Sequence, residues 1–409
     1  MRIGVLTGGG DVPGLNAAIR AVVRRAAQYD VEVVAIRNGW AGLLGNGAIF
    51  PLSIRSVSGI LPLGGTIIGA SRTNPFSGDP ALDYVIAHLS GVSTPEAQKA
   101  LEAVKSSQQA YKDRRLKEML DNIKNYGIDA IIAIGGRDTL GVANQVSKLG
   151  VKIVGIPKAM DNDLVETDYA IGFDSAVTHV MRALDDLHFT AAAHERVFVV
   201  ETMGRETGWV AMVGGLAGGA DFIIIPESPV TLAEVCDHIK KRHQAGKNYS
   251  IVVVAEGAEV ADLRTRTPNQ RDAFGRPRYD RRGIGDALSI AIEQATGYET
   301  RHVVLGHLQR GGSPTVFDRV LATRLGVTAV DLVQQGQVGQ MACRRDGKYT
   351  GVPLESVVSR IQMADQQYYD LAKIFFGERR LQSGSASIKR IGVLTGGGDC
   401  PGLNAALRA

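Results

Sequence analysis

The chain is poor in cysteine, has no long apolar run and carries little net charge, and each of these absences excludes a class of protein. Three cysteines in 409 residues are too few for a disulfide framework, which is typical of the reducing cytosol. No apolar run approaches the roughly 18 residues of a membrane span, and the N-terminus lacks the apolar stretch of a signal peptide. We therefore expect a cytoplasmic protein with no membrane partner.

The charge balance also argues against nucleic acid as a partner. The 46 basic and 42 acidic residues leave a net charge of +4 and are spread evenly along the chain. A content of 44% hydrophobic and 22% charged residues is typical of a globular protein with a core, and the length fits one or two sizeable domains. The unusual feature is the number of glycines, 49. They cluster after short apolar runs, at points where the backbone must come close to a neighbouring group.

Short β-branched runs alternate with helical segments along the chain. Near-continuous apolar character predicts buried strands of a parallel sheet covered on both faces. These runs are Ile3–Leu6, Glu32–Ile36, Ala130–Ile134, Lys152–Ile156, Val197–Val200, Phe222–Ile225, Ile251–Ala255 and His302–Leu305. The segments Asn16–Tyr29 and Leu140–Leu149 carry apolar residues at helical spacing. This alternation predicts an α/β fold of two doubly wound, Rossmann-like lobes, with the active site in the cleft between them at the carboxyl ends of strands.

One stretch, at about residues 77–112, interrupts the alternation with polar, helix-prone sequence. Thr94 and Pro95 have the pattern of an N-cap followed by proline in the first helical turn. An imperfect apolar stripe follows, formed by Leu101, Val104, Tyr111 and Met119. We interpret the stretch as a helical insertion on the surface, with a lid or a subunit contact as the alternative.

The end of the chain repeats its beginning. Residues 390–409 copy Arg2–Ala21 except at two positions, where Cys400 and Leu407 replace Val12 and Ile19. A Ser/Gly-rich linker is predicted at residues 378–389. The copy stops after one strand, one loop and half a helix, which is too little to bury its own apolar strand. We interpret it as a truncated repeat without a second active site; its exchange with the N-terminal strand, within or between chains, is the alternative.

A glycine loop, Thr7–Asp11, follows the first predicted strand and opens a helix. Its glycines leave backbone N–H groups bare, so that an anion can approach the helix N-terminus. The spacing matches neither G-x-G-x-x-G nor the Walker motif, which disfavours a nicotinamide-dependent dehydrogenase. By itself the loop is equally consistent with a phosphate site and with a purely structural turn.

Two further polar turns follow predicted strands. The first is Gly135–Thr139, with the sequence GGRDT. In the second, Asp161 and Asp163 stand two residues apart close to Lys158, and they can supply a general base and a metal or positioning group. An Asp-rich turn that caps the next helix is the alternative.

Four arginines also lie near predicted strand ends, and the planar guanidinium suits bidentate phosphate binding. They are Arg196, Arg205, Arg301 and Arg310. His307 precedes Arg310 and fits a ligand contact and a structural hydrogen bond equally well. No pair of histidines or cysteines has the spacing of a zinc site, so zinc is not expected.

Together these motifs closely resemble the phosphofructokinase family, whose members phosphorylate fructose 6-phosphate at O1. The resemblance covers a catalytic region at residues 1–377 apart from the insertion, with six motifs in the family's order. It implies that Asp161 is the base that takes the O1 proton, that Asp163 is the second carboxylate of the motif and that Arg205 is a third catalytic residue. It assigns the donor site to Gly10, Arg72, Asp138 and Lys158.

The resemblance also implies a sugar-phosphate site. Its residues would be Met203, Gly204, Arg205, Glu256, His307 and Arg310. Arg196 and Arg301 match arginines that the family supplies to the 6-phosphate from a neighbouring subunit, which implies a homodimer or a homotetramer.

The donor implied is pyrophosphate. In this family an aspartate at the position of Asp138 goes with pyrophosphate and a glycine goes with ATP; a carboxylate there would repel the α-phosphate of a nucleotide. Lys158 stands where many ATP-dependent members have glycine, and it adds positive charge for a bare pyrophosphate. ATP remains the alternative donor.

Two positions depart from the family pattern. Arg137 replaces the acidic residue that contacts magnesium in the family, so the Mg²⁺ that the resemblance implies is in doubt and its ligands are unassigned. The alternative is that the guanidinium of Arg137 binds pyrophosphate directly and takes over part of the role of the cation. Ala159 replaces a threonine and removes a hydroxyl near the substrate. The favoured hypothesis is an active phosphofructokinase with a compromised metal site. The alternative is an impaired homologue that binds sugar phosphate without turnover.

Overall fold

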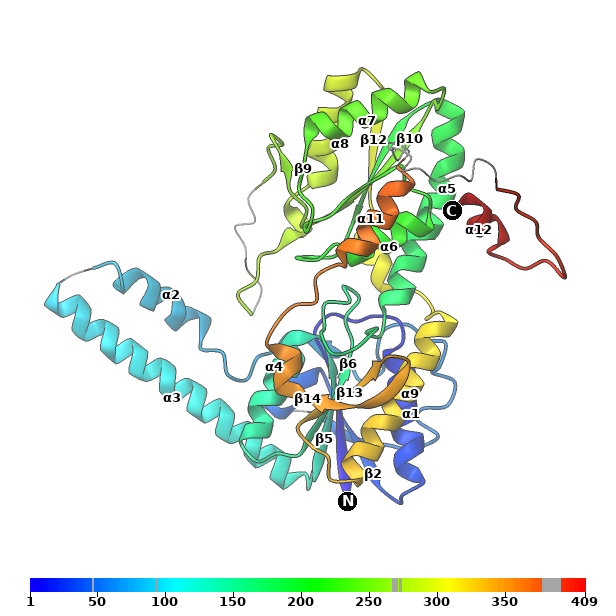
Figure 1. Cartoon of the computed structure of the whole chain (residues 1–409). Coiled ribbons are helices and arrows are strands. Elements are labelled where there is room, and N and C mark those ends of the chain that lie inside the picture. Colours follow the sequence, from blue (N-terminus) through cyan, green and yellow to red (C-terminus); the bar gives the residue numbers. More distant parts are fainter. Residues whose placement is uncertain (46–47, 93, 267–270, 272–273, 377–390) are drawn as a thin grey trace, which may run out of the picture.

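The structure is a computed structural model of the chain, and it describes all residues except 46–47, 93, 267–270, 272–273 and 377–390. The described residues form two α/β lobes stacked end to end (Figure 1). A pair of helices projects from the first lobe, and the C-terminal segment lies beside the second. The predicted linker, at residues 378–389, falls outside the described residues.

The first lobe is built on a sheet with the order β14-β13-β6-β5-β1-β2-β3, with β4 beside β1. Its strands are β1 (Arg2–Gly8), β2 (Glu32–Ile36), β3 (Ile49–Leu52), β4 (Ala70–Ser71), β5 (Ala130–Gly135), β6 (Ile153–Pro157), β13 (Gln340–Arg345) and β14 (Lys348–Pro353). All neighbours are parallel except the edge pairs β2–β3 and β13–β14. In the register of the central strand, Ile3 pairs with Val33 on one side and with Ala130 on the other.

Helices cover both faces of this sheet, which explains the continuous apolar strands. The helices α1 (Leu15–Ala27) and α9 (Val316–Gln334) pack on one face, and α4 (Arg137–Lys148) with α10 (Leu354–Val358) packs on the other. Side chains of β1 alternate between the two cores: Val5 belongs to the first and Leu6 to the second, and neither is exposed. The 3-10 turn η1 (Gly39–Leu43) extends the second core.

The second lobe contains a parallel sheet with the order β12-β7-β10-β8 and a small pair, β11–β9. The strands are β7 (Val197–Thr202), β8 (Phe222–Ile224), β9 (Val230–Thr231), β10 (Ser250–Ala255), β11 (Val260–Ala261) and β12 (Thr300–Val304). The helical elements are α6 (Trp209–Ala217), α7 (Leu232–Gln244), η2 (Tyr279–Arg281), α8 (Ile284–Thr296) and η3 (Gly306–Arg310). The predicted architecture of two doubly wound lobes is thus confirmed.

The chain passes between the lobes more than once. Helix α5 (Phe173–His194) leads from the first lobe to the second, and α9 leads back. The chain then returns through α11 (Gln366–Ile374), where the Tyr369 hydroxyl donates a hydrogen bond of 2.8 Å to the carbonyl of Ile223. The lobes are therefore interleaved in sequence.

All eight predicted strands are present within two residues of their expected bounds, but the burial predicted for His302–Leu305 was wrong. Strand β12 lies at the edge of its sheet, and Arg301, His302 and Val304 are exposed. Apolar sequence alone does not reveal which strand lies at an edge, because that depends on strand order.

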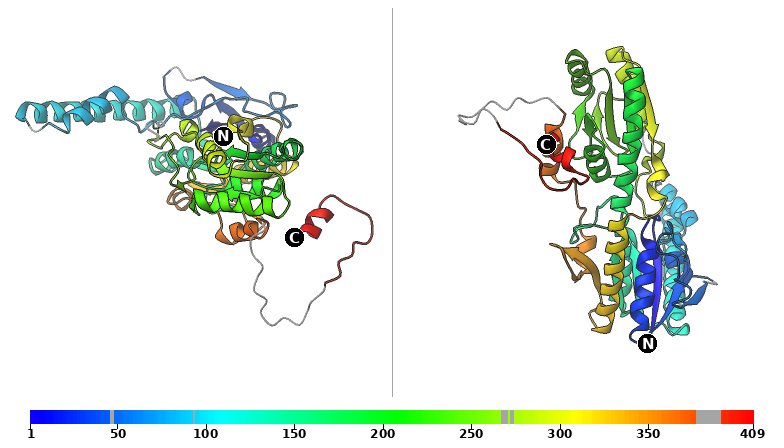
Figure 2. Two further views of the ribbon diagram at one scale, coloured as in Figure 1. Left: turned by 90° about the horizontal axis from the view of Figure 1, so that it is seen from above. Right: turned by 90° about the vertical axis from the view of Figure 1, so that its right-hand side faces the viewer.

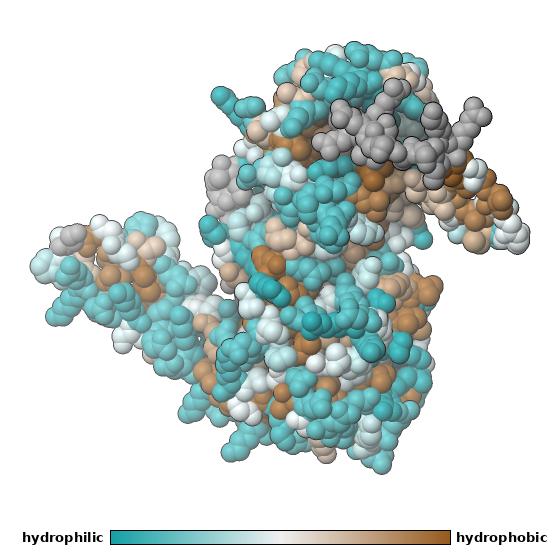
Figure 3. All heavy atoms as spheres, in the orientation of Figure 1, coloured by the Kyte–Doolittle hydropathy of each residue, from teal (hydrophilic) through white to brown (hydrophobic). Residues whose placement is uncertain are grey.

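The predicted insertion contains α2 (Pro80–Leu89) and most of α3 (Pro95–Asn125), which form the projecting arm (Figures 1 and 2). As predicted, the Thr94 side chain caps α3, accepting a hydrogen bond of 3.2 Å from the N–H of Ala97. Of the predicted apolar stripe only Met119 is buried. Tyr84 and Val85 of α2 are exposed, and hydrophobic atoms are visible on the projecting arm (Figure 3).

The C-terminal copy does not reproduce the structure of the N-terminal original. Residues 391–402 form no strand and stand outside the two lobes (Figure 2), and only α12 (Leu403–Arg408) is helical. The Arg408 guanidinium lies 5.0 Å from the ring centre of Phe375. Among the described residues no helix is both long and apolar enough to cross a lipid bilayer.

Candidate active site

The cleft between the lobes gathers most of the predicted site residues into two adjoining pockets. The pocket facing the first lobe, called the donor pocket, includes Gly9, Gly10, Arg72, Arg137, Asp138, Lys158, Asp161, Asp163, Arg205, Arg276 and Arg310. The pocket facing the second lobe, called the sugar pocket, is lined by Arg72, Met203, Arg205, Glu256, Pro277, Arg278, Tyr279 and His307. Arg72 and Arg205 line both pockets.

The glycine loop after β1 forms one wall of the donor pocket. Gly9 has φ +78° and donates a hydrogen bond of 2.8 Å to the carbonyl of Ser71. A Cβ atom on Gly10 would lie 2.8 Å from Nη1 of Arg310, and Arg310 is itself buried. Both positions therefore favour glycine. Gly9 has a backbone conformation that other residues rarely adopt, and Gly10 leaves room for the side chain of Arg310.

Lys158, at the end of β6, is the buried cation of this pocket. Its Nζ donates a hydrogen bond of 2.5 Å to the carbonyl of Gly10, and only 3% of the residue is exposed. Burial and, to a smaller extent, the Arg310 guanidinium lower the pKa of Lys158 to about 7, while the charge of Asp161 acts in the opposite direction. The ammonium thus gains or loses its proton near neutral pH, and a bound anion would favour the charged form.

Asp161 and Asp163 follow the same strand. Oδ1 of Asp161 is buried and has no hydrogen-bond partner among the described residues. Burial raises the pKa of Asp163 to about 6, and the neighbouring Asp161 charge adds to the rise, while Arg137 opposes it. An unpartnered carboxylate oxygen in a pocket can accept a proton from a bound hydroxyl group.

Arg137 is the first residue of α4, after the N-cap Gly136, which offers no side-chain cap. Its Nη2 lies 3.6 Å from Oε2 of Glu206, and its Nε is buried without a hydrogen-bond partner among the described residues. The next residue, Asp138, is held differently, by an ion pair of 2.5 Å to Arg276 from the second lobe. Both residues line the donor pocket, so this pair links the two lobes there.

The sugar pocket is organised by backbone groups around Glu256. Its Oε1 accepts hydrogen bonds from the N–H groups of Gly204 at 3.4 Å and Arg205 at 3.1 Å. Burial raises the pKa of Glu256 to about 7, and the charge of Asp161 contributes to the rise. Arg205 has the unusual φ of +50°, which turns the chain at the end of β7.

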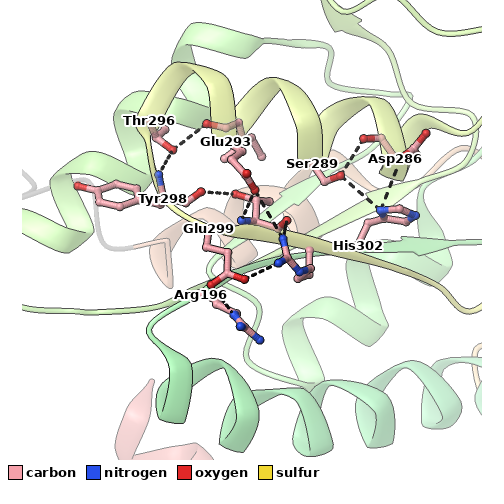
Figure 4. A network of polar contacts seen from close by, with 11 residues as sticks. Arg196, Asp286, Ser289, Glu293, Thr296, Tyr298, Glu299 and His302 are labelled. Atoms are coloured by element: carbon pink, nitrogen blue, oxygen red, sulfur yellow. Dashed lines mark hydrogen bonds and ion pairs between the residues drawn. The ribbon is translucent and has the colours of Figure 1, made fainter.

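Two of the predicted sugar-phosphate residues are not brought to the cleft of this chain. Arg196 precedes β7 and Arg301 lies near the start of β12, so both are at the amino ends of strands, opposite to His307. Arg196 forms an ion pair of 2.8 Å with Glu299 (Figure 4). Arg301 also forms an ion pair with Glu299. Their assignment to a neighbouring subunit's pocket stays a prediction.

The sequence-based assignment missed several cleft residues. Phe274 and Arg276 join the donor pocket, and Arg278 and Tyr279 join the sugar pocket. A signal was available, because residues 264–282 contain seven arginines. Their spacing matches no strand or helix period, so sequence alone did not say which of them reach the cleft.

The side chains of the donor pocket do not form a magnesium site by themselves. Magnesium prefers octahedral oxygen ligands, typically one or two carboxylates with phosphates and water. Across the described parts of the chain no group of three or more His, Cys, Asp or Glu side chains could hold a metal ion. Asp161 and Asp163 share the pocket with Arg137, whose guanidinium would repel a cation. We therefore derive no step through a metal.

Comparison with known proteins agrees with this geometry. The sequence model of the family described as "Phosphofructokinase" matches residues 2–333. The chain is 42% identical over 380 residues to pyrophosphate–fructose 6-phosphate 1-phosphotransferase of Dictyoglomus thermophilum, covering 92% of this chain and 99% of the relative. It is 41% identical over 378 residues to ATP-dependent 6-phosphofructokinase of Mycobacterium leprae, covering 92% and 100%.

The fold also matches solved structures. The crystal structure of pyrophosphate-dependent phosphofructokinase from Marinobacter aquaeolei superposes with a TM-score of 0.71 at 21% identity, covering 92% of this chain and 91% of that one. At this identity the likeness concerns the fold alone.

Proposed function

The chain belongs to the phosphofructokinase family, and from this premise we propose that it transfers a phosphoryl group from pyrophosphate to O1 of fructose 6-phosphate. The observation that carries the proposal is the position of Asp161. Asp161 lines a cleft in which a basic pocket adjoins a second pocket with Glu256 and His307, and its Oδ1 has no hydrogen-bond partner among the described residues. Such a carboxylate is suited to take a proton while two anionic substrates are held on either side.

In this mechanism the Asp161 carboxylate accepts the O1 proton as the sugar oxygen attacks the near phosphorus of the donor. The new O1–P bond forms while the bridging P–O bond breaks, and the bridging electron pair leaves with orthophosphate. Arg72 and Lys158 hold the donor oxygens, and Gly10 leaves room for them. The fixed cations stabilise the charge on the transferred group without reorganising.

Pyrophosphate is favoured over ATP by the pair Asp138–Arg276. The two paired side chains line the donor pocket from both lobes and leave less room there for the additional phosphate of a nucleotide. ATP remains the second candidate, because the Mycobacterium leprae relative carries that name at similar identity. A coupled assay with fructose 6-phosphate and either donor separates them; turnover with ATP alone would overturn the donor assignment.

We further propose that the sugar pocket is completed by Arg196 and Arg301 of a second subunit. Support comes from the surface beside His307, where Leu308 is 70% exposed and Val304 is 53% exposed, as expected of a contact face. The test mixes two inactive variants, Asp161→Ser and Arg301→Ser. If the pocket is shared, a mixed oligomer contains an intact site and activity returns. Absence of recovery in a confirmed mixed oligomer would contradict the shared pocket.

The impaired homologue remains the alternative, because Arg137 and Ala159 depart from the family pattern. That protein would bind fructose 6-phosphate without turnover under any donor condition. Calorimetric titration with the sugar phosphate, together with the coupled assay, distinguishes it from an active enzyme. The cytoplasmic location also stays a proposal, supported by the buried free thiols of Cys236 and Cys343.

A further inference from the structure

We propose that the donor pocket binds pyrophosphate as the metal-free anion, with the guanidinium of Arg137 supplying the positive charge beside the phosphates. The inference rests on the proposed function, because it concerns the chemical form of the donor of that same site. It predicts that free pyrophosphate, and not its magnesium complex, is the tight-binding species.

The first argument is the charge of the pocket. Its described lining has six basic side chains, Arg72, Arg137, Lys158, Arg205, Arg276 and Arg310, and three acidic ones, Asp138, Asp161 and Asp163. One acidic group is already paired, because Asp138 lies 2.5 Å from Arg276. A pocket with this excess of basic side chains attracts a polyanion that keeps its full charge, and it repels an additional dication.

The second argument is that Arg137 still has hydrogen-bonding capacity. Its Nε is buried and has no hydrogen-bond partner in the part of the chain that the structure describes. Its ion pair to Glu206 is long, at 3.6 Å, and the Glu206 side chain is 38% exposed. Nε of Arg310, which also lines the pocket, is likewise buried without a partner among the described residues. Leaving buried donors unsatisfied is costly, so two of them on residues that line one pocket favour an acceptor-rich ligand there.

The third argument is the backbone around Arg137. As the first residue of α4 it stands where helix N–H groups lack intrahelical partners, and Gly136 provides no side-chain cap. The helix N-terminus and the guanidinium thus add positive potential at the same place. The positive charge of Arg137 also acts to lower the pKa of Asp163 in the same pocket.

The test is calorimetric titration of the intact protein with sodium pyrophosphate, in EDTA and again in excess magnesium chloride. We expect the wild type to bind in EDTA and to bind about tenfold more weakly with magnesium. Arg137→Glu should lose about tenfold or more in EDTA and should bind better when magnesium is added. Arg137→Gln, which removes the charge without reversing it, should weaken binding in EDTA without gaining from magnesium.

The matched control is Arg114→Glu, an equal charge change on the exposed face of the arm helix α3, which should bind like the wild type. Wild-type binding only in the presence of magnesium would overturn the inference, as would equal affinities of wild type and Arg137→Gln in EDTA. Parallel titrations with fructose 6-phosphate and the coupled assay keep the two proposals separate. If the protein binds the sugar phosphate and turns over only in the presence of magnesium, the metal-free form of the donor is refuted and the proposed function is not. A protein that never binds the sugar phosphate refutes the function.

Discussion

The two halves of the cleft are built on different principles. In the donor pocket the charge comes from side chains. Lys158 donates a hydrogen bond to the carbonyl of Gly10, and Asp138 forms an ion pair with Arg276. In the sugar pocket the backbone sets the shape, because the N–H of Arg205, at φ +50°, holds Glu256. Donor preference can therefore change through a few side-chain substitutions, whereas a change of the sugar pocket requires a different turn after β7.

The strongest test of this comparison acts at the boundary between the two halves. Asp161→Ser should lower kcat by about 10³-fold, within the range for loss of a general base, and should leave the affinity for both substrates nearly unchanged. The measurement is the coupled assay combined with titrations of each substrate. The control is Asp185→Ser on the exposed face of α5. A large loss of sugar-phosphate affinity in Asp161→Ser would make Asp161 a binding residue.

The second test disturbs only the donor half. Gly10→Val should raise the KM for the donor by about 5- to 150-fold, because the added side chain displaces buried Arg310 and overpacking costs about 1–3 kcal/mol. The KM for fructose 6-phosphate should change much less. The matched control is Gly398→Val, the equivalent position of the C-terminal copy, where no atom lies within 4 Å of a new Cβ. Equal effects of the two variants would contradict the assignment of the loop.

The third test uses pH. Because the pKa of Lys158 is about 7, kcat/KM for the donor should fall by about tenfold per pH unit above that value. Lys158→Arg keeps its charge and should not show this fall. A fall that persists in Lys158→Arg would mean that another group titrates.

The same shift predicts a stability effect of definite sign. The folded-state pKa of Lys158 lies below its unfolded value of 10.5, so the unfolded chain binds more protons between about pH 7 and 10. The free energy of unfolding of the wild type should therefore rise with pH in this window relative to Lys158→Met. Denaturant titrations at several pH values measure the difference, and a fall relative to Lys158→Met would contradict the assignment.

The smallest expected effect is in the sugar half. Glu256→Gln keeps an oxygen acceptor for the N–H of Arg205 but turns the second oxygen acceptor into an N–H donor, so the KM for fructose 6-phosphate should rise by about 2- to 12-fold. The KM for the donor should stay the same. Initial rates with each substrate varied in turn measure both, and a larger change on the donor side would remove the distinction between the halves.

Much of this site could be predicted from the sequence because its chemistry is local. Lys158, Asp161 and Asp163 follow one strand within six residues, so the strand end alone brings them together. Arg276 could not be assigned in this way, because its partner Asp138 lies on the other lobe. The pairing depends on how the lobes face each other, and no periodicity in the chain encodes that.

The two copies of the first segment separate what sequence and tertiary structure each decide. Ile3 and Leu6 are fully buried in β1, whereas their counterparts Ile391 and Leu394 are 83% and 88% exposed and form no strand. The sequence by itself determined which residue types follow each strand and hence the chemistry that the cleft offers. Only the tertiary structure decided which copy becomes a strand and a glycine wall, because a strand is stabilised by neighbours on both sides and by helices on both faces. The single position that provides them is occupied by Arg2–Gly8.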